Sequence, residues 1–365
     1  MKRLVPYLII IPAALLMIIF PEMAVSCAEN ACRMCGEIII PSLFPFFVCS
    51  GLLVRSGLAE RAAIFAKPIM RPLFNIHENG AAAFILGIIS GYPLGAVTAC
   101  ELYDKGCITK SEAERLLAFC NNSGPLFILG AVGSAMFSSV SAGIILYTAP
   151  LLAAVSVGII FRFYRNTGNC VKKVPSKTEL KGFSEIFPAA LSAAADSMIT
   201  VCCAIIFFST VSGIITQLLP LDEITKAVIC GIAELTSGTK SISALPLPAV
   251  TRLVMSAFTV GFAGLCVHLQ VVAVCAGKGL SLRPYIVGKL FHGTLSAVYT
   301  LIILQFVPIT ESVFREIPQK GAAVMAGSLY QAVTILFSAI LACLVILLCG
   351  AHPHRQRSLK KERAA

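Results

Sequence analysis

The chain has 365 residues, of which 57% are hydrophobic and 13% are charged, and its mean hydropathy is +0.87. A soluble domain has about 45–50% apolar residues, so this composition excludes a soluble globular protein and predicts a single integral membrane domain over residues 1–365. The formal net charge of +11 does not indicate nucleic-acid binding, because the Lys and Arg residues form short clusters beside apolar runs, as orientation determinants of membrane proteins do.

Residues 1–25 predict a retained first membrane span. The apolar run after Lys2 and Arg3 is long for a signal peptide, and no clear A-x-A cleavage site follows it. Basic clusters at the N-terminus, in a polar loop at 162–182 and in a tail at 350–365 are all expected in the cytoplasm by the positive-inside rule. The chain must then cross the membrane an even number of times between successive clusters. Four basic residues between 55 and 71 fall on the opposite side and argue against this orientation of the first hairpin.

Two similar units follow the first span. The first, at 41–161, comprises a re-entrant hairpin, two broken helices and a continuous span. The second, at 183–277, comprises a hairpin and two broken helices, and plain spans follow at 283–307 and 321–349, which complete the segment 283–349. Three pairs of sequences resemble one another in the same order: FVCSGLL and TVCCAII, GIISGYPLGA and GIAELTSGT, AFCNNSGPL and AFTVGFAGL. We expect an all-α polytopic membrane protein with two inverted repeats and about eight full spans.

The stretch GIISGYPLGA, at 87–96, interrupts a run that is apolar enough to lie in lipid. Pro93 removes a backbone donor and clashes with the preceding turn, while Gly91 and Gly95 permit backbone angles that other residues resist. A helix can be interrupted at membrane depth only where protein or a wet cavity receives the released backbone groups. We therefore place Gly91, Tyr92, Pro93 and Gly95 in a candidate binding site, and a packing kink is the alternative.

Two further segments have the same character. NNSGP, at 121–125, brings two amides, a hydroxyl and a Gly-Pro pair between apolar helices, and ELTSGTKS, at 234–241, adds a carboxylate and a lysine. Paired interruptions in two inverted halves are typical of a secondary-transporter site near the bilayer midplane. The candidate residues of these segments are Asn121, Asn122, Ser123, Gly124, Pro125, Glu234, Thr236, Ser237, Gly238 and Lys240. The alternatives are that the asparagines only join helices and that the lysine snorkels to the interface.

Among the titratable residues Glu234 is the strongest candidate, because ionisable residues at membrane depth are rare and usually functional. His268 and His292, each single in an apolar run, are interpreted as core residues rather than proton carriers. Most of the fifteen cysteines are interpreted as small buried hydrophobes, and the single CxxC at Cys32 and Cys35 is weak evidence for redox or zinc chemistry. The sequence contains no P-loop, HExxH or GxSxG motif, so we expect no enzyme activity, no cofactor and no metal site.

The motifs SLFPFF, GYPLGA, ITKSEAERLLAFCNNSGPLFILGAVG and ELTSG resemble those of the YlbJ family of sporulation integral membrane proteins, also called SpoVV, whose members carry a nucleoside-recognition Gate domain. The resemblance covers nearly the whole chain after the first span. It implies a fold similar to the transport core of concentrative nucleoside transporters, with the ligand between hairpin tips and helix breaks. It also implies movement of dipicolinate, an anionic aromatic solute, across the outer forespore membrane during sporulation.

The residues that match the family motifs are Gly91, Tyr92, Pro93, Gly95, Asn122, Ser123, Gly124, Pro125, Glu234, Thr236 and Gly238. Leu94 stands where a small polar residue is expected, which weakens the case for a side-chain contact there but leaves the backbone role unaffected. This resemblance predicts that the protein lies in the cell membrane and that its partners are the small solute and the lipid bilayer. A coupling cation or proton and the formation of a homo-oligomer are further alternatives.

A dipicolinate-like substrate would use these residues in different ways. Half-helix N-termini near Gly95, Gly124 and Gly238 would hold its carboxylates, and Tyr92 would stack on its ring. The hydrogen-bonding side chains would be those of Asn121, Asn122, Ser123 and Thr236. Glu234 would be protonated or paired with Lys240 beside such a dianion, or would instead couple transport to a proton or cation. The alternatives are a nucleoside carrier and a membrane scaffold of a sporulation complex that transports nothing.

Overall fold

The computed structural model describes residues 5–56, 58–165 and 182–307. The secondary-structure elements of these residues are all helices, mainly α-helices with shorter 3-10 and π-helical stretches. Most of the predicted loop at 162–182, the predicted span at 321–349 and the basic tail at 350–365 lie outside the described residues.

Within the described residues, five helical stretches are long and apolar enough to cross a membrane. They are Pro21–Arg55, Val140–Phe161, Phe183–Leu218, Ala249–Val274 and Arg283–Phe306. The prediction of an all-α polytopic membrane protein is therefore confirmed. One of the about eight expected spans, at 321–349, lies outside the described residues. The parts of the broken helices of the first half, Ala81–Ile89, Leu94–Asp104, Lys110–Leu117 and Phe127–Met136, are each shorter than the about 20 residues that a crossing needs.

The N-terminal segment differs from the predicted single span at 1–25. Helix α1 covers Val5–Ile19, and Pro21 begins helix α2, Pro21–Met34. Proline suits the first position of a helix, because its missing N–H would have no helical partner there. α2 continues through a π-helical turn, η1 (Cys35–Ile39), into α3 (Ile40–Arg55). The sequence PSLFPFF, expected to open a re-entrant hairpin, is thus part of a continuous 35-residue helical stretch.

The remaining elements of the first half lead to a continuous helix. Their bounds are α4 Leu58–Ile69, η2 Met70–Phe74, η3 Glu78–Gly80, α5 Ala81–Ile89, α6 Leu94–Asp104, α7 Lys110–Leu117, η4 Phe127–Met136 and α8 Val140–Phe161. The chain therefore breaks between α5 and α6 and again between α7 and η4, at the two places where Gly and Pro interrupt the apolar runs. Both predicted breaks of the first half are confirmed.

The second half begins with a helix that contradicts the prediction. A hairpin was expected to open at FPAALSAAADS, but α9 runs unbroken from Phe183 to Leu218. Its one internal proline, Pro188, lies in the second turn, where it removes one backbone hydrogen bond without ending the helix. The expected breaks then follow, in the elements α10 Glu223–Ala233, α11 Leu235–Ser243, α12 Ala249–Phe262, α13 Gly264–Val274 and α14 Arg283–Phe306.

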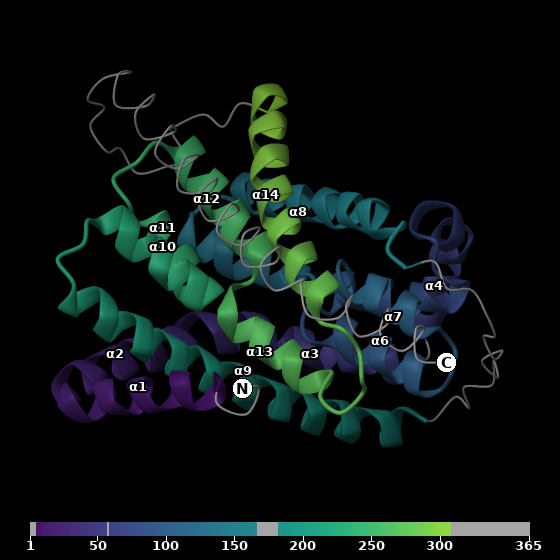
Figure 1. Ribbon diagram of the computed structural model, residues 1–365, viewed down its shortest axis with the longest axis horizontal. Helices are drawn as coiled ribbons and strands as arrows, with labels where there is room; N and C mark the ends of the chain where they lie inside the picture. Colours follow the sequence, from purple (N-terminus) through teal and green to yellow (C-terminus); the bar gives the residue numbers. More distant parts are fainter. Residues whose placement is uncertain (1–4, 57, 166–181, 308–365) are drawn as a thin grey trace, which may run out of the picture. The chain divides into compact units, whose positions relative to one another are not determined.

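The two halves share one order of elements after their long helices. In each half a first broken helix, a second broken helix and a continuous helix follow one another: α5 and α6, α7 and η4, then α8; α10 and α11, α12 and α13, then α14. The continuous helices α8 and α14 pack against each other and against α12 (Figure 1). α9 packs along α2 and α3 (Figure 1).

A glycine pair joins the parts of the first broken helix in each half. A Cβ added to Gly87 of α5 would lie 3.3 Å from the Cα of Gly95 of α6, and one added to Gly238 of α11 would lie 2.1 Å from the Cα of Gly231 of α10. Only a residue without a side chain permits such an approach of two backbones. The two halves therefore use the same packing device at corresponding places.

Candidate functional site

Four breaks in the helices form the core of the candidate site. The first break is Ser90–Pro93, the second covers 118–124, the third is at Glu234, and the fourth is at Ala263. The backbone of Glu234 is extended, at φ −149° and ψ 127°, between two helical residues.

Positive backbone angles bring these breaks together in pairs. Gly91, at φ +77°, passes so close to the second break that an added Cβ would lie 2.8 Å from the backbone nitrogen of Gly124. Gly264, at φ +72°, lies against the third break, where an added Cβ would be 3.1 Å from the nitrogen of Leu235 and 3.3 Å from the Cα of Glu234. Glycine adopts these angles without the steric cost of other residues. The first break thus contacts the second, and the fourth contacts the third.

One cavity lies where the two pairs of breaks face each other. Its volume is about 50 Å³. Its walls come from α3, α9, η4, α11, α13 and three of the breaks, and the lining residues are Leu43, Phe46, Phe47, Ser90, Gly91, Tyr92, Gly124, Phe127, Val201, Ile205, Glu234, Leu235, Thr236, Cys266, Val267 and Gln270. The predicted site residues Gly91, Tyr92, Gly124, Glu234 and Thr236 therefore lie around one space.

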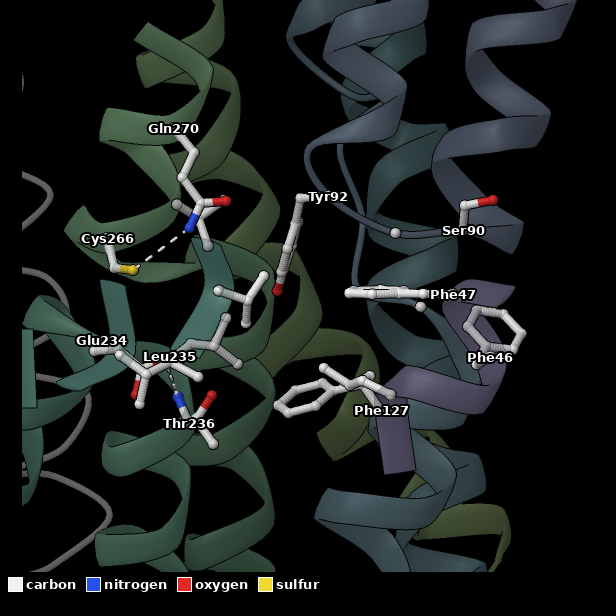
Figure 2. A pocket seen from close by; sticks show the side chains of 16 residues that line it. Phe46, Phe47, Ser90, Tyr92, Phe127, Glu234, Leu235, Thr236, Cys266 and Gln270 are labelled. Atoms are coloured by element: carbon white, nitrogen blue, oxygen red, sulfur yellow. Dashed lines mark hydrogen bonds between the residues drawn. The ribbon is translucent and has the colours of Figure 1, made fainter. Parts of the chain in front are cut away.

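The chemistry of the cavity is mainly aromatic and aliphatic. Figure 2 shows Tyr92, Phe47 and Phe127 on one side, facing Thr236 and Gln270 on the other. Such a lining, with few polar groups, is typical of sites for small organic molecules. It offers flat surfaces to a ring and a small number of hydrogen bonds to its substituents.

The Glu234 carboxylate caps the N-terminus of α11. Its Oε1 accepts a hydrogen bond from the backbone N–H of Thr236 at 2.8 Å, and its Oε2 accepts one from that of Ser237 at 2.7 Å. An acidic N-cap satisfies donors that the helix leaves free and complements the positive end of the helix dipole. The expected pairing with Lys240 is wrong for the described residues, because Lys240 is exposed near the C-terminal end of α11 and forms no ion pair there.

The side chains of the two asparagines in the second break form hydrogen bonds with backbone groups. Asn121 Oδ1 accepts a hydrogen bond from the N–H of Ala96, in the first turn of α6, at 3.2 Å. Asn122 Nδ2 donates to the carbonyl oxygen of Phe119 at 3.1 Å. Of the three half-helix N-termini expected to hold carboxylates, those of α6 and α11 are thus already capped by Asn121 and Glu234. Asn121 Nδ2 and Asn122 Oδ1 have no partner among the described residues.

Several predicted residues lie away from the main cavity. Asn122 and Ser123 line a second, smaller space beside α8, whereas Gly95 and Gly238 are used in the packing of the broken helices. The others that do not line the main cavity are Pro93, Asn121, Pro125, Ser237 and Lys240. The hydroxyl group of Tyr92, which lines the main cavity, forms a hydrogen bond with that of Ser123, which lines the smaller space.

Sequence reasoning missed three kinds of residue. The aromatic wall from Phe47 and Phe127 and the polar side chain of Gln270 come from helices that carry no break at those positions. Lys289 of α14 was also missed, although it is fully buried and its Nζ lies 5.8 Å from the centre of the Tyr92 ring. The sequence alone marks Lys289 as a candidate, since a lysine within a membrane span is by default a functional candidate.

Both histidines are buried, in keeping with their interpretation as core residues. His292 Nε2 contacts the carbonyl oxygen of Pro150 at 2.7 Å, and its Nδ1 faces Lys289. His268 Nδ1 contacts the hydroxyl of Tyr285 at 2.8 Å, whereas its Nε2 has no partner among the described residues. Within that part of the chain, no cluster of three His, Cys, Asp or Glu side chains forms a metal site.

Comparisons with known proteins found one family model and one relative that match this chain. Residues 38–155 match the Gate family model, which is described as nucleoside recognition. The chain is 26% identical over 318 residues to the "Sporulation integral membrane protein YlbJ" of Bacillus subtilis (strain 168), a match that covers 78% of each chain. No solved structure matches the chain. The protein carries a Gate nucleoside-recognition domain and is a homologue of the sporulation integral membrane protein YlbJ.

Proposed function

We propose that this protein is a transporter of a small anionic aromatic solute, and specifically of dipicolinate across the outer forespore membrane during sporulation. The observation that carries the proposal is the meeting of helix breaks from both halves at one aromatic-lined cavity. Its similarity to a sporulation membrane protein supports the cellular setting.

The helix breaks support transport over a scaffold function. Unpaired backbone groups at membrane depth are tolerated only where they are buried in protein or line a water-filled cavity. Three of the four breaks contribute residues to the cavity wall: Gly91, Gly124 and Glu234. A scaffold has no need of broken helices around an internal space.

The shared order of elements supports two inverted repeats. In secondary transporters with such repeats, the substrate lies between discontinuous helices and one half moves relative to the other. The matching glycine pairs, Gly87 with Gly95 and Gly231 with Gly238, let the two parts of each broken helix pack closely against each other. Movement would then occur between the halves, where the cavity lies.

The lining of the cavity supports an aromatic substrate. Tyr92, Phe47 and Phe127 offer ring faces and edges, and aromatic pairs gain about 0.5–1.5 kcal/mol beyond their buried area. Thr236 and Gln270 provide hydrogen-bonding groups on the opposite wall. The anionic character of the substrate is inferred from the family resemblance of the motifs around these residues.

A nucleoside is the second candidate substrate. It is favoured by the description of the Gate family, whose match at 38–155 includes the first and second breaks. A nucleoside also has a flat aromatic ring and hydrogen-bonding substituents, so the same walls would suit it.

Thermal unfolding of the purified full-length protein separates the two substrates. A ligand at 100 times its dissociation constant should stabilise the folded protein by about 2.7 kcal/mol. We expect dipicolinate to raise the melting temperature and a panel of uridine, adenosine and benzoate to raise it less. Tyr92→Ala should abolish the dipicolinate effect. Stabilisation by uridine or adenosine alone would instead establish a nucleoside site, and no stabilisation by any of them would overturn both substrates.

A further inference from the structure

The side-chain amine of Lys289, in α14, is buried and contacts groups from three other parts of the chain. Its side chain is fully buried. Its Nζ donates a hydrogen bond to the carbonyl oxygen of Asn121, and it lies 3.4 Å from the carbonyl oxygen of Gly261 and 3.3 Å from Nδ1 of His292. The ring of Tyr92 lies 5.8 Å from the same nitrogen, within the range of a cation–π contact.

The partners indicate that the amine is protonated. An ammonium group has three donors and no acceptor, and three acceptors surround Nζ. His292 is the acceptor among the side chains, because its Nε2 donates to the carbonyl oxygen of Pro150 and leaves the lone pair on Nδ1 toward Lys289. A neutral amine would direct its own lone pair at one of these acceptors. The geometry therefore fits a charged lysine with every donor used.

The charge has no acidic partner. Within the described part of the chain, no carboxylate lies close enough to Lys289 to form an ion pair. The hydroxyl of Tyr285 faces His268 rather than Lys289. A buried charge is costly unless it is paired or hydrogen-bonded, so the carbonyl dipoles and the Tyr92 ring must compensate it.

The two carbonyl groups belong to interrupted helices. Asn121 lies in the second break, and Gly261 lies in the last turn of α12, before the fourth break. The last four carbonyls of a helix have no partner within the helix. In transporters with broken helices, unwound carbonyls and half-helix C-terminal ends coordinate the Na⁺ or proton that drives transport.

We propose that the Lys289 ammonium is a built-in cation that takes the place of a coupling metal ion at these carbonyls. It holds the second break of the first half to α12 of the second half, and its charge is already present when the substrate arrives. The consequence for coupling rests on the proposed transport function: substrate movement needs no Na⁺ at this position. The consequence for stability rests only on the contacts of Lys289.

The test removes the Lys289 amine by substitution and then adds a free cation in solution. Lys289→Ala removes the amine and leaves space beside the two carbonyls, while Lys289→Met keeps most of the side-chain volume without the charge. Thr300→Ala is the matched control, because Thr300 is buried in the same helix and its hydroxyl donates a hydrogen bond to the carbonyl oxygen of Ser296 at 2.8 Å. Each protein is unfolded by heat in NaCl, methylammonium chloride and choline chloride at equal ionic strength.

We expect the wild type and Thr300→Ala to melt at the same temperature in all three salts. Lys289→Ala should melt at a lower temperature in choline, and NaCl or methylammonium should recover at least half of that loss. Lys289→Met should lose stability without recovery, because its side chain fills the space. Equal melting of Lys289→Ala in the three salts would overturn the proposal, and so would a wild type that is stabilised by Na⁺ over choline.

A second measurement covers the case in which neither lysine variant folds. Wild-type protein in vesicles should move dipicolinate at the same rate in NaCl and in choline chloride. A requirement for Na⁺ would overturn the built-in cation while leaving the transport function intact. If no solute is moved or bound, the substrate proposal fails, and the salt dependence of wild-type melting still tests the role of Lys289.

Discussion

The hydroxyl groups of Tyr92 and Ser123 form a hydrogen bond that joins the first break to the second. Tyr92 lines the larger cavity and Ser123 lines the smaller space beside α8. The pair therefore forms part of the wall between two hollow regions of the protein.

The strength of this contact can be measured with a double-mutant cycle. Tyr92→Phe keeps the ring and removes its hydroxyl, and Ser123→Ala removes the other partner. A hydrogen bond of this kind contributes about 0.5–1.5 kcal/mol to stability, so the coupling free energy from chemical unfolding should fall in that range. Thr300→Ala combined with Tyr92→Phe is the control and should be additive. Additivity of Tyr92→Phe and Ser123→Ala would show that the hydroxyls do not interact.

Leu94 should have no direct role in ligand binding. Although it follows Pro93 in the GYPLG motif, its side chain does not line the cavity. Leu94→Ser, which introduces the small polar residue expected at this place, should leave the dissociation constant of dipicolinate unchanged within a factor of two. Phe47→Ala is the comparison, since it removes part of the wall and should weaken binding at least tenfold. A marked change in affinity on Leu94→Ser would place that side chain at the substrate.

Gly91 should tolerate no larger residue. Its φ of +77° disfavours any Cβ, and an added Cβ would lie 2.8 Å from the backbone nitrogen of Gly124. Left-handed geometry costs about 1–2 kcal/mol for a residue with a side chain, and overpacking adds about 1–3 kcal/mol. Gly91→Ala should therefore lower the free energy of unfolding by about 2 kcal/mol or more. Gly36→Ala is the matched control.

An added Cβ at Gly36 meets nothing within 4 Å, and its backbone is helical. Alanine is favoured over glycine in a helix by up to about 1 kcal/mol, so Gly36→Ala should be neutral or stabilising. If both variants unfold at the wild-type denaturant concentration, the contact between the first and second breaks does not contribute to stability.

The places where the chain breaks could be predicted from local chemistry. Gly91 and Pro93 in the first break, and Gly124 in the second, disfavour a continuous helix, although a single proline such as Pro150 lies within α8 without ending it. The third break, at Glu234, was signalled by its match to the first. The pairing of breaks into one site also followed, because an interruption at membrane depth needs a protein or water environment.

Other features depended on contacts that a local pattern does not contain. The hairpin expected at the start of the second half is a continuous helix, because residues 189–212 contain neither Gly nor Pro to interrupt α9. The role of Glu234 as a cap depends on the bend of one residue between α10 and α11. Lys289 reaches a carbonyl 168 positions away along the chain, a contact that no local spacing reveals.

The N-cap of α10 should make stability depend on pH. Asp222 accepts hydrogen bonds from the Thr225 hydroxyl and from the backbone N–H groups of Thr225 and Ile224, and these hold its pKa below the ordinary value of 3.8. Because the folded pKa is lowered, the stabilisation is present above pH 3.8 and is lost as the pH falls through the folded value. Asp222→Asn removes this titration.

The melting temperatures of the wild type and Asp222→Asn should therefore differ most at neutral pH and converge as the pH falls below about 4. Since Asp222 is exposed, the difference should also shrink at high salt. A difference that stays constant from pH 7 to pH 3 would mean that the carboxylate charge at this cap does not stabilise the fold.

Glu234 should stabilise the fold by capping the N-terminus of α11. Glu234→Ala leaves the N–H groups of Thr236 and Ser237 without their acceptors in a buried place, which should cost about 0.5–2 kcal/mol of stability. Glu234→Gln keeps one acceptor oxygen and should lie between the wild type and Glu234→Ala. Chemical unfolding of the three proteins tests this order.

A second measurement separates the cap from a direct role in transport. Spores that lack this gene but synthesise dipicolinate normally should lack the solute, and the native gene should restore it. If Glu234 couples transport, both variants should fail to restore dipicolinate even when their amounts in the membrane equal the wild type. If it only caps α11, Glu234→Gln should restore dipicolinate in proportion to its stability, because an amide keeps the helix in place but carries no charge. Full rescue by Glu234→Ala would remove both roles, since that variant has neither acceptor nor charge.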